Sequence, residues 1–303
     1  DLKKIWNVNH YSKKEKKMSP LLYFAYENNN LLIADTLAKI YSINLSNGEL
    51  NWSKNNFSPF NSNTLVFKNM LIAVDYANTI RAFDTSSGNE VWNFKSENSF
   101  IKSNKKLSII LIGDVIYFIS NLGDITALNA NDGSLAWQTP TQGDDVYLTS
   151  FKLKNSDIVF ANDSIFFSNN KNEFFSIDAR SGITKWKQTI SSSLRPTIID
   201  KLIFSVSDNG FLFVIDNDSG NIIRIIDIFK NIKKKKKNLK PTGFVISKNK
   251  IYISLNNGQL IKFDAESGIQ ENIYKISSSQ IKRPFVMDQN IYFIKSNSII
   301  KSN

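Results

Sequence analysis

The stretch "ITALNANDGSLAW", residues 125–137, joins an alternating apolar segment to a polar turn and then to a tryptophan four positions after a glycine. Related stretches align on that glycine at residues 40–52, 80–92 and 174–186, and two weaker copies lie at 212–224 and 260–272. Self-similarity at a period of about 20–50 residues is typical of repeat proteins, including propellers. The quoted stretch is therefore one copy of a repeat unit.

Two residue types recur at fixed places in this unit. The repeat glycines are Gly48, Gly88, Gly133, Gly182, Gly220 and Gly268. Four tryptophans follow a glycine by four positions, and a fifth lies near the N-terminus: Trp52, Trp92, Trp137 and Trp186, with Trp6. An Asp or Asn before the glycine can accept hydrogen bonds from the turn backbone, and the glycine can adopt the positive φ that the turn requires. We expect each indole to be buried where neighbouring units meet.

Short apolar segments upstream of each turn complete the unit. In the third copy, the segments 106–112, 115–120, 125–129 and 134–139 are separated only by turn residues. This spacing predicts a four-stranded antiparallel meander. Because no segment shows sustained helical periodicity, we predict an all-β chain, and repeated four-stranded units are typical of a β-propeller.

The number of units predicts seven blades in a single domain over residues 1–303. Six units carry the glycine, and the tail at 278–303 has three strands but no tryptophan strand. The N-terminal "LKKIW" can supply that fourth strand, so we expect the N-terminal strand to join the C-terminal blade and to close the propeller, which removes a sheet edge. The predicted blades cover about residues 19–54, 57–95, 105–140, 146–189, 194–227, 241–275, and 281–303 together with 1–8.

Composition excludes several classes of site. The chain has no cysteine, and His10 is its one histidine, so thiolate or His-rich metal sites and Ser/His/Asp catalysis lack a central residue. The longest apolar run, 108–119, contains Asp114 and is shorter than the ~18 residues of a membrane span. "DNDSGN" at 216–221 resembles the start of a calcium loop, but no Glu closes it and it is in register with the other repeat turns. No metal, cofactor or catalytic residue is predicted.

The net charge of +11 comes mainly from lysine, because only five of the 38 basic residues are arginine. Two lysine clusters, "KKEKK" at 13–17 and the run Lys233, Lys234, Lys235, Lys236 and Lys237, fall in predicted loops between one blade and the next. They have two interpretations, a surface for an acidic partner or anionic lipid head groups, and a solvated charge run. No aromatic-interleaved basic motif accompanies them, so we predict no nucleic-acid partner.

The pattern apolar-x-[Asp/Asn]-x-x-x-Gly-x-x-x-Trp resembles the quinoprotein (PQQ-like) propeller repeat along essentially the whole chain. Within that superfamily the chain is similar to the BamB family of periplasm-facing outer-membrane assembly lipoproteins. The resemblance implies a contact with a BamA-like barrel-assembly protein through a Leu-x-Leu-Arg segment after a tryptophan strand. Here "SSSLRP" offers Leu194 and Arg195, while Ser192 stands at the first leucine position and the family's acidic pair is replaced by the lysine run.

The resemblance implies a non-enzymatic, monomeric interaction scaffold in the periplasm that assists assembly of outer-membrane β-barrel proteins. Its predicted partner-binding residues are Leu194, Arg195 and Lys233–Lys237. The chain starts at Asp1 without a methionine, so we expect an anchor, if any, to have come from a leader that is removed or absent. The alternative is a PQQ- and Ca²⁺-binding dehydrogenase or another ligand-binding propeller. Against it stand the absence of cysteine and the placement of most acidic residues in repeat turns.

Overall fold

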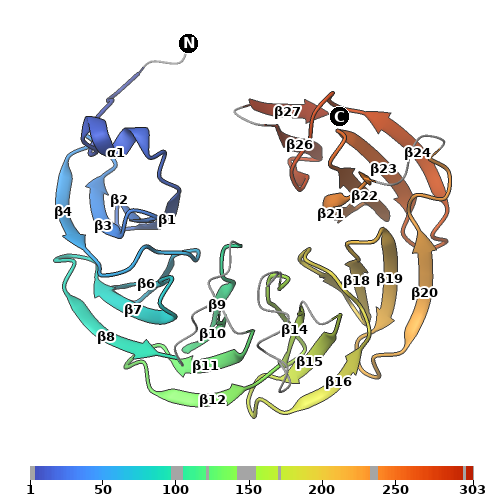
Figure 1. Ribbon diagram of the computed structural model, residues 1–303, viewed down its shortest axis with the longest axis horizontal. Coiled ribbons are helices and arrows are strands. Elements are labelled where there is room, and N and C mark those ends of the chain that lie inside the picture. Colours follow the sequence, from blue (N-terminus) through green and yellow to red (C-terminus); the bar gives the residue numbers. More distant parts are fainter. Residues whose placement is uncertain are drawn as a thin grey trace. The chain divides into compact units, whose positions relative to one another are not determined.

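The computed structural model describes residues 4–96, 105–120, 123–141, 155–169, 172–232, 238–295 and 298–302. The chain divides into two compact units, Asp1–Lys154 and Asn155–Asn303. Each unit consists of antiparallel sheets in which consecutive strands pair with one another (Figure 1). None of the described helices has the length and apolarity to cross a membrane.

The first unit contains three four-stranded sheets. Its strands are β1 (Leu22–Glu27), β2 (Asn30–Asp35), β3 (Lys39–Asn44) and β4 (Leu50–Asn55); β5 (Leu65–Phe67), β6 (Met70–Val74), β7 (Thr79–Asp84) and β8 (Glu90–Lys95); and β9 (Ile109–Ile112), β10 (Val115–Ile119), β11 (Ile125–Asn129) and β12 (Leu135–Thr139). The second and third strands of each sheet are largely buried, as expected for apolar segments covered on both faces.

The second unit contains three four-stranded sheets and, among the described residues, one three-stranded sheet. Its strands are β13 (Val159–Ala161), β14 (Ser164–Ser168), β15 (Phe174–Asp178) and β16 (Thr184–Gln188); β17 (Thr197–Ile199), β18 (Leu202–Val206), β19 (Phe211–Asp216) and β20 (Ile222–Asp227); β21 (Pro241–Ser247), β22 (Lys250–Leu255), β23 (Gln259–Asp264) and β24 (Gln270–Lys275); and β25 (Phe285–Met287), β26 (Asn290–Lys295) and β27 (Ser298–Ser302). The described strands thus form the seven sheets predicted from the sequence.

The turn between the third and fourth strands has the same glycine conformation in all six four-stranded sheets, with φ between +71° and +76°. In the second sheet the Asp84 carboxylate accepts hydrogen bonds from the backbone N–H groups of Ser86 and Ser87, at 3.2 and 2.8 Å. Gly88 follows with a φ of +71°, a conformation that costs a residue with a Cβ about 1–2 kcal/mol. A β-bulge then shifts the pairing of the two strands between Ala82 and Phe83.

Trp52, Trp92 and Trp186 each pack on the glycine of the next sheet along the chain. Trp52 of β4 lies so close to Gly88 that a Cβ on this glycine would be 2.4 Å from the indole Cε3 atom. The Trp52 Nε1–H donates to the carbonyl oxygen of Thr85 at 2.9 Å. Equivalent donors and acceptors are Trp6 with Leu45, Trp92 with Ala130, and Trp186 with Asn217. At these interfaces an indole therefore packs between two consecutive sheets and donates a hydrogen bond to a backbone carbonyl oxygen of the next sheet's turn.

The segment before the first sheet differs in part from expectation. Residues 13–17, predicted as loop, form the short helix α1 (Lys13–Lys17), because Ser12 and Glu15 make a capping box. Residues 4–8, predicted as a strand, do not form one, although Trp6 contacts Gly48 in the way that Trp52 contacts Gly88. Pairing of this segment with the C-terminal sheet stays a prediction.

Candidate protein-interaction surface

The linker before β17 is fixed to the second unit by its serines. The buried Ser192 hydroxyl donates to the carbonyl oxygen of Val206 at 2.7 Å and accepts from the Leu194 N–H at 3.1 Å. The Ser193 hydroxyl donates to the Asp208 carboxylate at 2.6 Å. The linker is thereby held on the turn between β18 and β19. Ser192, which replaces the family's first leucine, has a structural role in this chain.

The two predicted binding residues of this linker have different environments. Leu194 is half-buried and packs against the apolar cluster between the fifth and sixth sheets, which includes Phe204 and Phe244. Arg195 is exposed. Leu194 therefore anchors the linker, and Arg195 is the group that it presents to solvent.

A second arginine, Arg283, lies close enough to Arg195 for their charges to interact. Arg283 precedes β25 in the segment "ISSSQIKRP" (276–284), which repeats the "ISSSLRP" of 190–196. Its Nε–H donates to the carbonyl oxygen of Phe244 at 3.1 Å, and its backbone lies directly over Gly243, where an added Cβ would be 2.5 Å from the Arg283 Cα atom. Gly243 of β21 thus allows the segment to pack closely enough to hold Arg283 in place.

The two guanidinium groups repel each other. Much of Arg283 is exposed, but its guanidinium end lies against the backbone of β21. Desolvation of this group lowers the pKa of Arg283, the positive charge of Arg195 lowers it further, and Asp157 opposes the shift. Within the described residues neither arginine forms an ion pair. We define Arg195 and Arg283 as the arginine pair, a positively charged surface that an acidic group would stabilise.

Sequence reasoning identified Arg195 and missed Arg283. The sequence pattern that points to Arg283 is a basic residue followed by a proline at the end of a linker. It occurs three times, as Arg195-Pro196, Lys240-Pro241 and Arg283-Pro284. Because these residues lie in consecutive linkers, aligning the linkers as well as the turns would have found all three. Lys240 is exposed at the start of β21.

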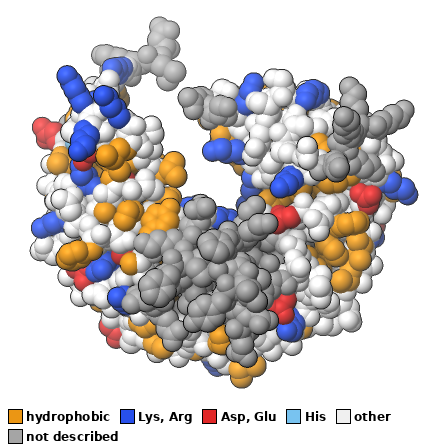
Figure 2. Space-filling view, in the orientation of Figure 1, with side chains coloured by type: hydrophobic (Ala, Val, Ile, Leu, Met, Phe, Trp, Pro, Cys, Tyr) orange, Lys and Arg blue, Asp and Glu red, His pale blue; other side chains and the backbone are white. Residues whose placement is uncertain are grey.

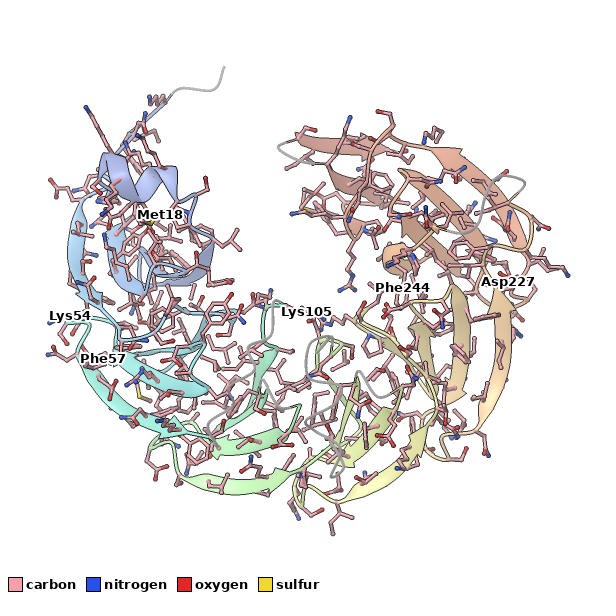
Figure 3. The ribbon with its side chains drawn as sticks, viewed as in Figure 1. Met18, Lys54, Phe57, Lys105, Asp227 and Phe244 are labelled. Carbon is pink, nitrogen blue, oxygen red and sulfur yellow. The ribbon has the colours of Figure 1, made fainter. Side chains whose placement is uncertain are left out.

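The lysine clusters lie elsewhere in the chain. Lys233–Lys237 fall in the linker between β20 and β21, outside the described residues; Asp227 at one end of this linker and Phe244 beyond the other are labelled in Figure 3. In the first unit the four lysines of α1 are exposed, and Figure 2 shows basic side chains gathered over this helix. Glu15 is held by Lys39 at 2.8 Å, and hydrogen bonds from Lys39 and Ser12 lower the pKa of Glu15 to about 2.

The acidic residues of the repeat turns are occupied by hydrogen bonds. In "DNDSGN" the Asp216 carboxylate accepts from the backbone N–H of Ser219 at 2.8 Å and from its hydroxyl at 2.7 Å, as a turn residue does. Asp35 is fully buried and accepts hydrogen bonds from the Tyr11 hydroxyl and from the backbone of Leu37. In the described part of the chain, no three His, Asp or Glu side chains come together as a metal site would require.

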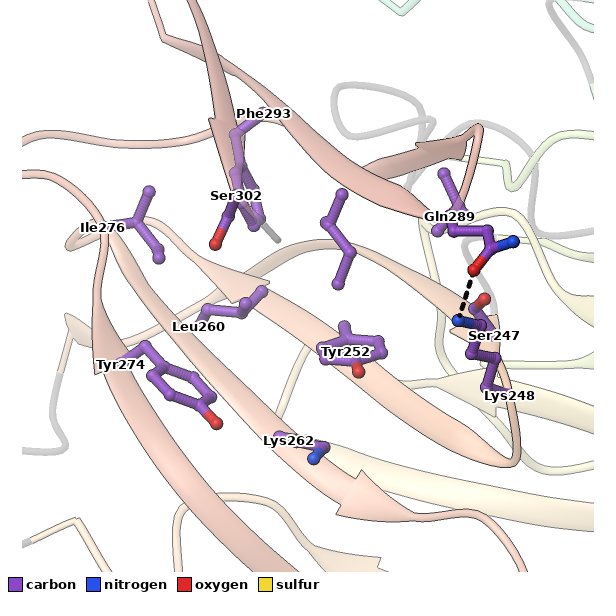
Figure 4. Close-up of a pocket in the computed structure, with 12 residues that line it drawn as sticks. Ser247, Lys248, Tyr252, Leu260, Lys262, Tyr274, Ile276, Gln289, Phe293 and Ser302 are labelled. Atoms are coloured by element: carbon purple, nitrogen blue, oxygen red, sulfur yellow. Dashed lines mark hydrogen bonds between the residues drawn. The ribbon is translucent and has the colours of Figure 1, made fainter.

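A cleft of about 290 Å³ lies between β22–β24 and the last sheet, β25–β27 (Figure 4). Tyr252, Leu260 and Phe293 are among its lining residues, and the Lys248 Nζ donates to the Gln289 Oε1 at 3.1 Å. The residue of β24 at the repeat tryptophan position is Asn272, four residues after Gly268. The cleft thus forms where the chain lacks an indole.

The family model described as "Outer membrane protein assembly factor BamB" matches residues 3–226. The chain belongs to the BamB family. BamB of Yersinia pestis is 22% identical over 246 residues, which cover 76% of this chain and 60% of that protein. BamB of Salmonella typhimurium is 29% identical over 89 residues, which cover 28% of this chain and 23% of that protein. The matches therefore span less than two thirds of these curated relatives.

The crystal structure of BamB from Moraxella catarrhalis has the same fold. It superposes with a TM-score of 0.75, covers 92% of this chain and 83% of that chain, and is 15% identical in sequence. Together with the seven sheets described above, this similarity confirms the predicted β-propeller fold.

Proposed function

We propose that this BamB-family chain is a non-enzymatic scaffold for assembly of outer-membrane proteins, which binds an acidic surface of a BamA-like partner through the arginine pair. The observation that carries this proposal is Arg195, a solvent-exposed arginine without an ion pair among the described residues, held on a linker that is fixed by Ser192 and Ser193. An arginine binds a carboxylate strongly because its planar guanidinium can form two parallel hydrogen bonds with the two carboxylate oxygens.

The family supports the setting of this interaction. The curated relatives are named outer membrane protein assembly factors, so we propose that this chain acts as a monomer on the periplasmic side of the outer membrane. Lys233–Lys237 lie in the linker between β20 and β21, and we propose that they extend the same basic surface toward the partner or toward anionic lipid head groups.

A charge reversal tests the arginine pair. We expect Arg195→Glu in the full chain to reduce recovery of barrel-assembly components in a pull-down by at least about tenfold, since a desolvated charge pair contributes several kcal/mol. Arg180→Glu is the matched control, because Arg180 is also an exposed arginine of the second unit but lies in the turn between β15 and β16. Equal losses for both variants would contradict the proposal.

Two further measurements separate this role from the alternatives. Partner binding through the arginine pair should weaken as salt rises, because screening acts on exposed charges. PQQ with Ca²⁺ should leave the melting temperature of the chain unchanged. A thermal shift together with alcohol-dependent dye reduction would instead favour the quinoprotein dehydrogenase.

A further inference from the structure

One sheet interface of the second unit shows what the repeat tryptophan contacts. Trp186 of β16 stacks on Phe174, with ring centroids 6.0 Å apart and planes inclined by 14°. Phe166, Ala161 and Ile198 belong to the same apolar cluster. The Trp186 Nε1–H donates to the carbonyl oxygen of Asn217 at 2.9 Å. The site for this indole therefore combines apolar walls with one hydrogen-bond acceptor.

The next interface along the chain has an arginine at the tryptophan position. Trp186 is paired with Ser176 across the strands, and Arg224 is paired with Val214 immediately before the equivalent bulge. The side chains of Ile226 and Arg224 lie over Gly268, where an added Cβ would be 2.6 Å from the Ile226 Cδ1 atom and 3.0 Å from the Arg224 Cδ atom. Within the described residues no group donates a hydrogen bond to the carbonyl oxygen of Ala265, which corresponds to the Asn217 oxygen. The acceptor remains, but its indole donor is missing.

A groove of about 490 Å³ opens at this interface. Its apolar lining includes Ile199, Leu202, Phe204 and Ile246, and Ala265 forms part of its wall. In the repeat register three of these residues correspond to the cluster around Trp186: Phe204 to Phe166, Ile199 to Ala161, and Ile246 to Ile198. Ile199 is 40% exposed, so the groove is open to solvent. The outer apolar walls of a tryptophan site thus persist without a tryptophan of this chain, while Ile226 and Arg224 cover Gly268 at its base.

We propose that this groove binds the tryptophan side chain of a peptide segment from a partner protein. The ring would lie against Phe204 and Ile246, and its N–H would donate to the Ala265 carbonyl oxygen. Tryptophan is the occupant that fits, because the equivalent site at the preceding interface is filled by an indole with both kinds of contact. A leucine could fill the apolar part of the groove but would leave the carbonyl without a donor.

The groove and the arginine pair lie at opposite ends of the strands. The groove is formed by the turns after β17, β21 and β23, whereas Arg195 and Arg283 lie in linkers before β17 and β25. In an antiparallel meander these turns and linkers are at opposite sheet edges. This proposal therefore does not depend on the proposed function, and each can fail without the other.

N-acetyl-tryptophanamide is the probe for the groove. Titrated into the full chain, it should give saturable shifts of the Ile199 and Ile246 methyl resonances in ¹H–¹³C NMR spectra, and N-acetyl-leucinamide should bind at least about tenfold more weakly. No saturable shift, or equal affinity for the two probes, would overturn the proposal.

Two variants test whether the shifts come from the groove. Arg224→Trp combined with Val214→Ala, which reproduces the Trp-Ala pairing of the second and third sheets, should fill the site and abolish the shifts at Ile246. Ile199→Lys should weaken binding of the probe by at least about tenfold, since it places a charge on the apolar wall. Ile223→Lys is its matched control, because Ile223 is 54% exposed, lies next to Arg224 on β20 and is not part of the groove lining.

The experiment still tests the proposal if the variant with Arg224→Trp and Val214→Ala, called the filled variant, fails to fold. Circular dichroism and thermal melting report whether its sheets are intact, and if they are not, the comparison of Ile199→Lys with Ile223→Lys decides alone. Unchanged binding in the folded filled variant, or equal effects of the two lysine variants, would show that the probe binds elsewhere and would overturn the proposal.

Discussion

Gly88 has no side chain because Trp52 occupies the space in which one would lie. The glycine also holds a φ of +71°, so two separate requirements coincide at one residue. The positive φ could be predicted from the turn sequence, and an indole between units from the repeat, but the contact of Trp52 with Gly88 could not, because the two residues belong to different repeat units. The interaction of Arg283 with Arg195 could not be predicted in this way, because the two residues lie in different linkers and only the folded chain brings their charges close enough to interact.

The two requirements at Gly88 can be separated by substitution. Gly113 also has a positive φ, of +59°, but an added Cβ there would have no atom within 4 Å. We expect Gly88→Ala to lower the free energy of unfolding by at least about 2 kcal/mol more than Gly113→Ala, because it also displaces the half-buried indole of Trp52. Urea unfolding measures both variants. Equal losses would mean that the backbone conformation alone explains the glycine.

The repeat turn is the element that the sequence predicts best. Its carboxylate, its glycine and the following strand are local in the chain, so their geometry depends little on distant contacts.

The helix α1 was not predicted from the sequence. Its five residues lack a buried face, and only the capping box of Ser12 and Glu15 indicates it, a signal that periodicity alone does not reveal.

The turns also predict how stability depends on pH. Hydrogen bonds from Ser86 and Ser87 lower the pKa of Asp84, and those from Ser181 and Ser219 lower the pKa values of Asp178 and Asp216. A carboxylate with a lowered pKa stabilises the fold above its unfolded pKa of about 4, and this stabilisation is lost as the pH falls through the folded value. We therefore expect the free energy of unfolding to decrease as the pH falls below about 4.

Asparagine at these positions separates charge from hydrogen bonding. Asp84→Asn keeps an acceptor oxygen but cannot titrate, so its stability should vary less with pH over this range than that of the unmodified chain. Asp114→Asn is the control, because the Asp114 side chain accepts no hydrogen bond from the described residues. Urea unfolding at a series of acidic pH values measures the slope. An unchanged slope for Asp84→Asn would exclude this turn as a source of the pH dependence.

At the scale of the whole molecule, the first and last sheets predict how the chain ends are joined. The last sheet has three strands among the described residues, while Trp6 contacts Gly48 as the repeat indoles contact their glycines. The register that sets Trp52 opposite Ser42 in the first sheet would set Trp6 opposite Lys301 and Asn9 opposite Ser298. The sequence alone predicted the closing strand, but it could not give this register.

Cysteine pairs test the closure, and the chain has no native cysteine to interfere. Asn9→Cys combined with Ser298→Cys should form a disulfide under mild oxidation, since directly opposed residues lie within about 6 Å. Asn9→Cys with Ser302→Cys should not, because four residues of strand displace the second thiol by about 13 Å. Non-reducing electrophoresis and mass spectrometry distinguish the two. Cross-linking of both pairs, or of neither, would argue against the predicted register.

The forward direction of the indole contacts has a consequence for how the chain folds during synthesis. Trp52, Trp92 and Trp186 contact turns that are translated after them, so each of their sheets keeps an aromatic ring exposed to water until the next sheet emerges from the ribosome. The packing of such a sheet is therefore completed only after the next sheet has been translated. Truncation directly after β4, β8 or β16 should for this reason leave Trp52, Trp92 or Trp186, respectively, uncovered.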